Sequence, residues 1–314
     1  MSITESLSGK IVTVLGGSGF VGRHLAQELL ARGARLRIAS RHPKKAFAIK
    51  PLGNLGQVQF AGVDVTRPES LAAVLAGSDA VVNLVGAFAG KLDALQGSGA
   101  GSIAAAAKAA GAQAFVHVSA IGADAGSDVA YARTKAEGEA AVLAAFPTAT
   151  VVRPAVMFGP DDAFVNMFGG LIARLPVLPV FVPSARLQPV FVDDVAVAIG
   201  NALSSTAAQG KTFELAGPEV LTMLQLNQRI AAAQGRSRSF AELPDAVAGL
   251  IAALPGTPIS GNQIKLLKAG SAASGTLPGL DDLGVTARPL GLFLDRWMVR
   301  FCKNGRFGGK TAHA

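Results

Sequence analysis

The sequence contains little cysteine, few aromatic residues and few charges. Of its 314 residues, one is cysteine, 6% are aromatic and 16% are charged. Cys302 alone cannot form an internal disulfide or a cysteine-based zinc cluster, and the four histidines have no metal-ligand spacing. These scarcities exclude a disulfide-stapled secreted fold and predict that no metal site is present.

Long apolar runs are also missing, although 50% of the residues are hydrophobic. No segment approaches the ~18 consecutive apolar residues that a membrane-spanning helix needs. The first eight residues lack the basic-then-apolar order of a secretory signal. We therefore expect a cytoplasmic chain that buries a sizeable core.

What the first 155 residues do contain is an alternation of β-branched runs with alanine-rich stretches. Strands are predicted at residues 10–15, 35–40, 57–61, 80–85, 114–119 and 150–153. Helices are predicted at residues 20–32, 68–75, 101–110 and 129–145. Because buried strands that alternate with helices form parallel sheets, we expect an α/β fold, a doubly wound parallel Rossmann sheet with a smaller C-terminal lobe.

After Pro154 the alternation becomes weaker. Helices are predicted at residues 193–203 and 223–233, with a strand at 211–216 between them. Residues 171–183 carry three prolines and are predicted to form an apolar loop. The expected division is a nucleotide-binding Rossmann domain over 1–155, a smaller substrate or partner lobe over 156–286 interleaved with the sheet, and a basic amphipathic tail over 287–314.

A glycine-rich turn lies between the first predicted strand and the first predicted helix. Gly16 permits a tight turn, Gly19 lets the backbone approach a pyrophosphate, and Gly22 lets the helix pack closely on the strand. The helix N-terminus also offers unpaired N–H groups to phosphate. This placement favours dinucleotide binding over a plain turn. The predicted contacts are Gly16, Ser18, Gly19, Phe20, Val21, Gly22 and Arg23.

No acidic residue occurs between Leu29 and Val63, whereas seven basic residues do. An NAD-selective site places an acidic residue at the end of the second strand, and here Ser40 and Arg41 stand at that position. A guanidinium suits a 2′-phosphate, so we expect NADP(H), with Arg41 as its ligand and Arg23 and Lys44 in support. The alternative is a solvated basic face.

The single tyrosine, Tyr131, stands four residues before Lys135. On a helix these positions share a face, and an ammonium there would lower the tyrosine pKa from about 10. The pair could then protonate a carbonyl that receives hydride, and Ser119 could donate a further hydrogen bond. The alternative is that Tyr131 only packs and Lys135 only meets solvent.

Several short motifs resemble, in order, those of the short-chain dehydrogenase/reductase superfamily, in its extended and atypical branches. They lie at residues 16–22, 64–65, 83–86, 119, 131 with 135, 153–154 and 189–194. The resemblance covers roughly the first two thirds of the chain. Within the superfamily, residues 117–123 and the basic tail are most similar to the NADPH-binding accessory subunits of respiratory complex I and their bacterial relatives.

The resemblance implies roles for further residues. Asp64 and Val65 would border the adenine, and Lys135 would hold the nicotinamide ribose. The nicotinamide side would be lined by Leu84, Val85, Gly86, Val118 and the backbone after Pro154. Only eleven residues separate Ser119 from Tyr131, fewer than reductases of this superfamily usually keep. The complex I subunits imply a bound nucleotide without established turnover.

The C-terminal segment combines an apolar stripe with basic charge. Its apolar residues recur at three- and four-residue steps, at Leu290, Phe293, Leu294, Trp297 and Phe301. From residue 287 onward, six basic residues stand against Asp295 alone, a net charge of +5 out of the +8 of the chain. This pattern predicts contact with an anionic membrane or with complex I. The alternative is packing on the protein's own second lobe. No nucleic-acid recognition motif is present.

Three functions are consistent with these patterns. The leading hypothesis is an NADP(H)-binding protein, peripheral on the inner face of a membrane, in quinone-linked respiratory metabolism. The second is a soluble NADPH-dependent oxidoreductase that reduces a small apolar carbonyl or quinone, with residues 171–181 lining its pocket. The third is an NADPH-sensing regulator without catalysis.

Overall fold

The computed structural model describes residues 6–244, 246–247, 249, 259–303 and 305. The chain forms two compact units, each built from three stretches of sequence. Unit 1 comprises Met1–Pro154, Val192–Leu215 and Ser274–Thr286, and unit 2 comprises Ala155–Phe191, Ala216–Ala273 and Ala287–Ala314. The expected boundaries at residues 155 and 286 came with a second lobe interleaved with the sheet, and in the structure the chain re-enters unit 1 twice.

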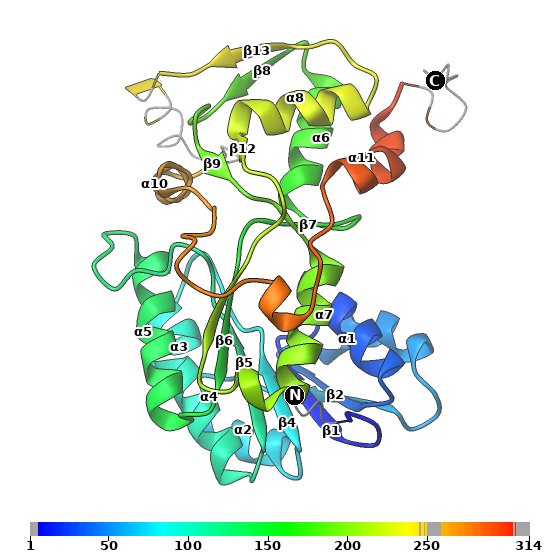
Figure 1. Cartoon of the computed structure of the whole chain (residues 1–314), viewed down its shortest axis with the longest axis vertical. Helices are drawn as coiled ribbons and strands as arrows, with labels where there is room; N and C mark the ends of the chain where they lie inside the picture. Colours follow the sequence, from blue (N-terminus) through cyan, green and yellow to red (C-terminus); the bar gives the residue numbers. More distant parts are fainter. Residues whose placement is uncertain (1–5, 245, 248, 250–258, 304, 306–314) are drawn as a thin grey trace. The chain divides into compact units, whose positions relative to one another are not determined.

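Unit 1 is built on a seven-stranded parallel sheet with the order β11-β6-β5-β4-β1-β2-β3 (Figure 1). Its strands are β1 (Ile11–Leu15), β2 (Arg35–Ser40), β3 (Val58–Gly62), β4 (Ala80–Asn83), β5 (Ala114–Val118), β6 (Thr150–Pro154) and β11 (Thr212–Leu215). The order reverses between β1 and β4, and the carboxyl ends at such a reversal form a ligand crevice in doubly wound folds. The predicted doubly wound Rossmann sheet is thereby confirmed.

Helices cover both faces of this sheet (Figure 1). On one face α1 (Phe20–Ala31) packs against α7 (Val192–Ser204). The other face carries α2 (Pro68–Leu75), α3 (Leu92–Gln96), α4 (Ser98–Ala109) and α5 (Ala130–Ala145). The core beneath these helices includes the buried side chains of Leu15, Ile103, Phe115 and Val142. Short 3-10 helices complete the unit: η1 (Pro43–Leu52), η2 (Thr206–Ala208) and η3 (Asp281–Leu283).

Unit 2 combines short paired strands with helices. The pairs are β7 (Met157–Phe158) with β10 (Val190–Phe191), β9 (Arg186–Leu187) with β12 (Leu221–Thr222), and β8 (Val177–Val180) with β13 (Ser239–Glu242). The helices are α6 (Phe164–Arg174), α8 (Met223–Ala233), α10 (Gly261–Ala269), α11 (Gly291–Met298) and the 3-10 helix η4 (Val299–Phe301). A capping box formed by Thr222 and Gln225 begins α8.

The segment at residues 171–183 is not the predicted loop. It contains the last turn of α6 and the whole of β8. Pro176 lies beyond the end of the helix, and Pro179 lies in a strand that pairs on one side only. A proline in an edge strand costs no ladder hydrogen bond, so the prolines did not exclude regular structure here.

The amphipathic C-terminal helix is present as α11 and η4, but unit 2 covers its apolar side. Phe293 stacks on Phe191 with ring centroids 4.0 Å apart, and Trp297 packs on Phe158 at 6.2 Å. These contacts favour the alternative, in which the apolar side of the helix packs on the protein's own second lobe. Arg306 and Lys310 of the predicted tail lie outside the described residues.

Candidate dinucleotide site

The glycine-rich turn joins β1 to α1 at the reversal of the sheet. Gly16 has φ +76°, and a Cβ there would lie 3.1 Å from the Leu84 carbonyl carbon. A Cβ at Gly22 would lie 2.3 Å from the Gly17 carbonyl oxygen, so a side chain would force the helix away from the turn. The exposed Gly19 precedes α1 and supplies no side-chain cap, which leaves the first N–H groups of α1 available to an anion.

The end of β2 carries a buried hydroxyl beside an exposed cation. Ser40 is 8% exposed, and its Oγ has no hydrogen-bond partner among the described residues. Arg41, directly after it, is exposed. Asp64 follows β3 and accepts hydrogen bonds from the Thr66 N–H and hydroxyl. These hydrogen bonds hold the pKa of Asp64 below its usual value, with smaller contributions from the positive charges of Arg67 and Arg41.

Lys135, Gly86 and the end of β5 at Val118 lie close together, on the side of β1 away from β2. The Lys135 Nζ donates to the Val118 carbonyl oxygen at 3.0 Å. A Cβ at Gly86 would lie 3.2 Å from the same Nζ, so a larger residue would displace the ammonium. Lys135 is 4% exposed, and burial lowers its pKa to about 8, although the charge of Glu139 acts against that shift. These residues are three of those expected at the nicotinamide end of a dinucleotide.

Tyr131 lies in the first turn of α5 and stacks on Phe88, with ring centroids 4.7 Å apart and an interplanar angle of 17°. Burial raises the pKa of Tyr131 to about 12. The expectation that Lys135 lowers this pKa is therefore not met, because the ammonium of Lys135 is directed at Val118 and the phenol is desolvated. Among the described residues, no hydrogen bond joins the Tyr131 hydroxyl to Lys135 or Ser119.

Two buried polar atoms without partners lie at the end of β5. The hydroxyl of Ser119, which is 4% exposed, lacks a hydrogen-bond partner in the described part of the chain, as does Nε2 of His117. The His117 Nδ1 lies 3.1 Å from Asn83 Nδ2, and the Asn83 Oδ1 accepts from the Val85 N–H. Burial, with a smaller contribution from the charge of Lys135, lowers the pKa of His117 to about 3, so the ring is neutral.

Gln96 joins two elements of this region and was not predicted from the sequence. Its fully buried side chain accepts from the Ala87 N–H at 3.0 Å and donates to the Thr134 hydroxyl at 3.0 Å. It thereby ties the segment after β4 to the first turns of α5. No sequence motif marks Gln96, because a single glutamine in a short helix has no characteristic pattern. The one available clue is that its partner Ala87 follows the predicted contact Gly86.

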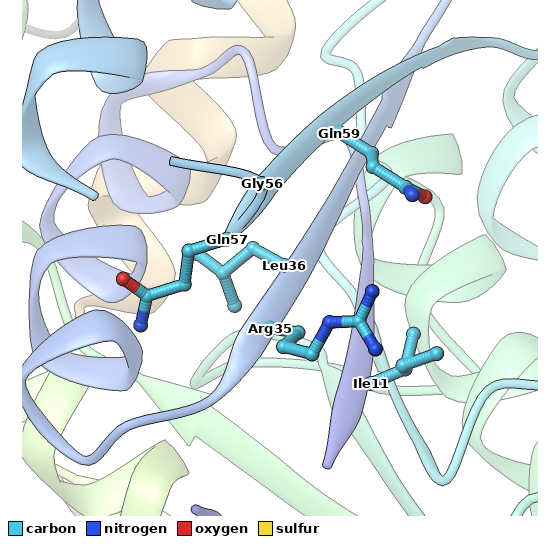
Figure 2. A pocket seen from close by; sticks show the side chains of 6 residues that line it. All are labelled: Ile11, Arg35, Leu36, Gly56, Gln57 and Gln59. Carbon is cyan, nitrogen blue, oxygen red and sulfur yellow. The ribbon is translucent and has the colours of Figure 1, made fainter. Parts of the chain in front are cut away.

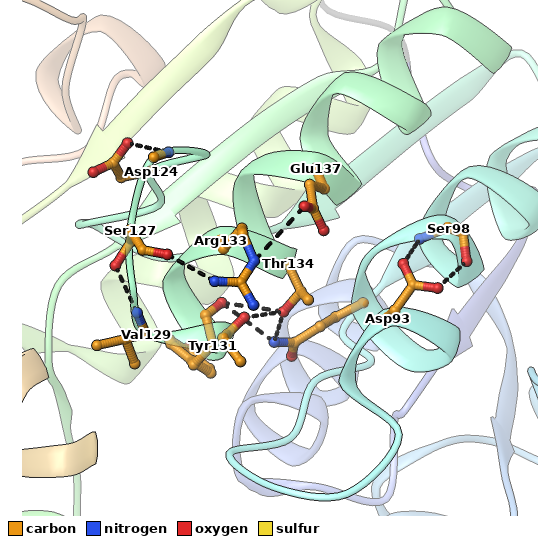
Figure 3. A network of polar contacts seen from close by, with 12 residues as sticks. Asp93, Ser98, Asp124, Ser127, Val129, Tyr131, Arg133, Thr134 and Glu137 are labelled. Atoms are coloured by element: carbon orange, nitrogen blue, oxygen red, sulfur yellow. Dashed lines mark hydrogen bonds and ion pairs between the residues drawn. The ribbon is translucent and has the colours of Figure 1, made fainter. Parts of the chain in front are cut away.

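The loop before α5 is held by polar contacts (Figure 3). The Arg133 guanidinium donates to the Ser127 carbonyl oxygen at 2.9 Å, and the Ser127 hydroxyl accepts from the Val129 N–H at 3.1 Å. The Thr134 hydroxyl donates back to the Ala130 carbonyl oxygen at 2.7 Å. These bonds fix the short connection between Ser119 and Tyr131.

Arg153 on β6 lies between two acidic side chains, Glu139 on α5 and Glu214 on β11. The Arg153 guanidinium on β6 makes two hydrogen bonds, of 2.9 and 2.6 Å, to the carboxylate of Glu139 on α5. The charge of Glu214 on β11 adds to that of Glu139 in raising the pKa of Arg153. Glu214 in turn accepts from the Ser274 N–H at 2.6 Å and so joins the returning segment 274–286 to the sheet. Arg153 therefore has a structural role below Pro154.

A small pocket also occurs at the opposite edge of the sheet, where the strands begin (Figure 2). Ile11 and Arg35 are the first residues of β1 and β2, and Gln57 precedes β3. The Gln57 side chain donates to the Ala34 carbonyl oxygen at 2.9 Å. This pocket lies away from the carboxyl ends of the strands and is not part of the candidate site.

The residues present suit a dinucleotide. The N-terminus of α1, which has no side-chain cap, fits a pyrophosphate. The hydroxyls of Ser40 and Ser119, which lack a hydrogen-bond partner in the part of the chain that the structure describes, lie at the ends of β2 and β5. Among the described residues, no group of three His, Cys, Asp or Glu side chains could hold a metal ion. No described helix is both long and apolar enough to span a membrane.

Comparison with known proteins identifies two family models in the chain. A model described as NAD(P)H-binding matches residues 16–162, and one described as RmlD substrate binding domain matches residues 124–249. Among solved structures, Pal from Bacillus thuringiensis covers 92% of this chain and 98% of its own, with a TM-score of 0.72 and 15% identity. That likeness concerns the fold alone.

Two relatives share more of the sequence. NADH dehydrogenase (ubiquinone) 1 alpha subcomplex subunit 9, mitochondrial, of Arabidopsis thaliana is 31% identical over 98% of this chain and 82% of its own length. A protein of Caulobacter vibrioides named ceramide reductase is 34% identical over 59% of this chain and 58% of its own length. The chain therefore belongs to the atypical short-chain dehydrogenase/reductase family of NAD(P)H-binding proteins that includes the subunit 9 relatives.

Proposed function

We propose that this chain is an NADP(H)-binding accessory protein of the complex I type, whose nucleotide is held in unit 1 and is not turned over through Tyr131. The observation that carries the choice of NADP(H) is the end of β2. The buried hydroxyl of Ser40, which has no hydrogen-bond partner among the described residues, lies there beside the exposed Arg41, where an NAD-selective site has an acidic side chain. A hydroxyl and a guanidinium are both donors, as a 2′-phosphate requires.

The other parts of the nucleotide would meet residues already described. The N–H groups that begin α1 would bind the pyrophosphate, with Ser18, Phe20, Val21 and Arg23 beside them. Asp64 and Val65 would border the adenine. The amine of Lys135 would donate to the nicotinamide ribose, near Leu84, Val85, Gly86 and the strand end at Val118. When bound, the nicotinamide is the group that can supply a hydride.

An accessory role is supported by the state of Tyr131. With a pKa of about 12, the phenol is a weaker acid than an ordinary tyrosine, and Phe88 covers one face of its ring. The subunit 9 relative is named as part of NADH dehydrogenase (ubiquinone). We infer that this chain associates with an equivalent respiratory assembly, in which bound NADP(H) serves structure or sensing.

The nucleotide proposal is tested by reversing the charge at residue 41. We expect Arg41→Asp to weaken NADPH binding about 10- to 100-fold, because hydrogen bonds to the 2′-phosphate are lost and a negative charge faces it. NADH, which lacks that phosphate, should lose little affinity. Both are measured by fluorescence titration.

The matched control is Arg35→Asp, which makes the same charge change on an exposed residue at the other end of β2. It should leave the ratio of the two affinities unchanged. A parallel loss of NADPH and NADH in Arg41→Asp would mean that the 2′-phosphate binds elsewhere.

A reductase of apolar carbonyl compounds is the second candidate. Phe88 is 66% exposed although it stacks on Tyr131, so it offers an apolar surface beside the phenol. The similarity to the protein named ceramide reductase also favours this reading. It predicts that Tyr131→Phe retains NADPH binding and loses turnover of a long-chain ketone or a quinone. Equal turnover in the variant and the parent would remove Tyr131 from the chemistry.

A further inference from the structure

Apolar side chains protrude from η1 and from the loop that follows it in unit 1. Phe47 and Leu52 are 49% and 50% exposed, and Leu55 at the loop tip is 107% exposed. Ala46 and Ile49 of the same 3-10 helix are fully buried, so the outward side chains stand on an anchored element. Large apolar side chains that gather in one exposed segment are typical of a contact surface.

The same segment carries unbalanced positive charge. Lys44, Lys45 and Lys50 are exposed, and their side chains make no ion pair or hydrogen bond recorded in the described part of the chain. No acidic residue lies between Leu29 and Val63 to neutralise them. We call Lys45, Phe47, Lys50, Leu52 and Leu55 the basic–apolar patch.

We propose that the basic–apolar patch rests on an anionic phospholipid surface. The leucines and Phe47 would enter the acyl boundary, while the lysine ammonium groups meet the lipid phosphates. This surface is distinct from the C-terminal helix, whose apolar side is covered within unit 2. The inference does not depend on bound nucleotide.

Charge and shape favour a bilayer over other occupants. A second copy of this chain would bring the same positive patch, and the like charges would repel. An acidic protein would neutralise the lysines, but it would also need a pocket for the isolated tip residue Leu55. A bilayer interface accepts single protruding apolar side chains at any position and supplies anionic headgroups around them.

The test is flotation of the full chain with phosphatidylcholine vesicles, with and without phosphatidylglycerol. We expect binding to the anionic vesicles only, and loss of binding as salt is raised toward 1 M, where the screening length falls to about 3 Å. The variant Lys45→Gln/Lys50→Gln should bind about fivefold more weakly for each lysine removed. Leu52→Ser/Leu55→Ser should bind roughly tenfold more weakly for each leucine.

Matched controls come from exposed residues elsewhere. Lys108→Gln/Lys265→Gln removes the same charge, and Leu292→Ser removes the exposed leucine of α11, which is 53% exposed. Both should float as the parent does. NADPH titration of every variant reports folding, because none of these residues is placed in the nucleotide site.

Three results would overturn the proposal. They are no flotation of the parent with anionic vesicles, equal flotation of the patch variants and the parent, or equal binding to neutral and anionic vesicles. The first result would leave an acidic protein as the occupant. Failure of NADPH binding with intact flotation would instead contradict the proposed function and leave the membrane surface standing.

Discussion

Tyr131 and Lys135 lie four residues apart on α5, yet their polar ends have different surroundings. The Lys135 ammonium donates to the Val118 carbonyl oxygen, and the ring of Tyr131 stacks on Phe88. Both pKa values move in the direction that burial alone produces, upward for the phenol and downward for the amine. Reactivity at this pair would therefore depend on what a bound nucleotide or substrate changes.

The single tyrosine makes its ionisation directly measurable. An ordinary phenol is half ionised near pH 10, but Tyr131 with a pKa of about 12 should show almost no phenolate at that pH. The measurement is an ultraviolet titration of the folded protein, with Tyr131→Phe as the blank. Half-ionisation at or below pH 10 in protein that remains folded would show that Lys135, rather than burial, controls the phenol.

Lys135 should make the stability of the chain depend on pH. Its pKa is about 8 when folded and near 10.5 when unfolded, so the unfolded chain binds more protons between these values. Stability must then rise as pH increases from 8 toward 10.5, because the cost of burying the charge disappears. Between pH 7 and 9.5 we expect a gain of roughly 2 kcal/mol, seen in urea unfolding as the difference from Lys135→Met. A difference of zero or the opposite sign would contradict the burial argument.

At the scale of elements, the turn between β1 and α1 depends on the absence of side chains. Gly22→Ala places a methyl group 2.3 Å from the Gly17 carbonyl oxygen, a contact that cannot be accommodated without shifting α1. We expect a loss of about 1–3 kcal/mol in the free energy of unfolding and weaker NADPH binding. Thermal unfolding and nucleotide titration measure the two effects.

The control for this substitution is Gly261→Ala. Gly261 is the first residue of α10, and a Cβ added there would have no atom within 4 Å. This variant should lose neither stability nor affinity. If both variants behave alike, close packing at Gly22 is not what the turn requires.

Much of the sheet could be predicted because most of its strands have a recognisable local sequence pattern. β2 and α2 have the predicted bounds, since the alternation of Leu36 and Ile38 with arginines, and the proline that begins α2, are local patterns that need no distant partner to be recognised. The prolines of residues 171–183 misled the prediction, since the position of a proline relative to a helix end or a sheet edge is a tertiary property. The same holds for the burial of the apolar side of α11.

In the candidate site too, some residues could be predicted from local sequence patterns, whereas others are recognised only from their tertiary contacts. Gly16 and Gly22 were predicted from motif spacing, and the structure brings Lys135 beside Gly86, as the family resemblance implies. Gln96 and Phe88 were missed because their importance comes only from contacts with α5. The lowered Tyr131 pKa was wrongly expected because a shared helix face does not make two long side chains meet.

At the scale of the whole molecule, unit 1 is closed by parts of the chain that return from unit 2. The strand β11 and the segment 274–286 are joined through Glu214, which accepts hydrogen bonds from Ser274. The candidate site itself lies in the first stretch of unit 1, between Gly16 and Pro154. Nucleotide binding is therefore the property on which the proposed function of the whole chain depends.

The most direct test is native mass spectrometry of protein purified without added nucleotide, followed by titration with NADPH. We expect one NADPH per chain, either retained through purification or taken up in the titration. Retention would support a structural or sensing cofactor, and reversible uptake would favour the reductase. A chain that binds neither NADPH nor NADH in either experiment would show that unit 1 is not a dinucleotide site.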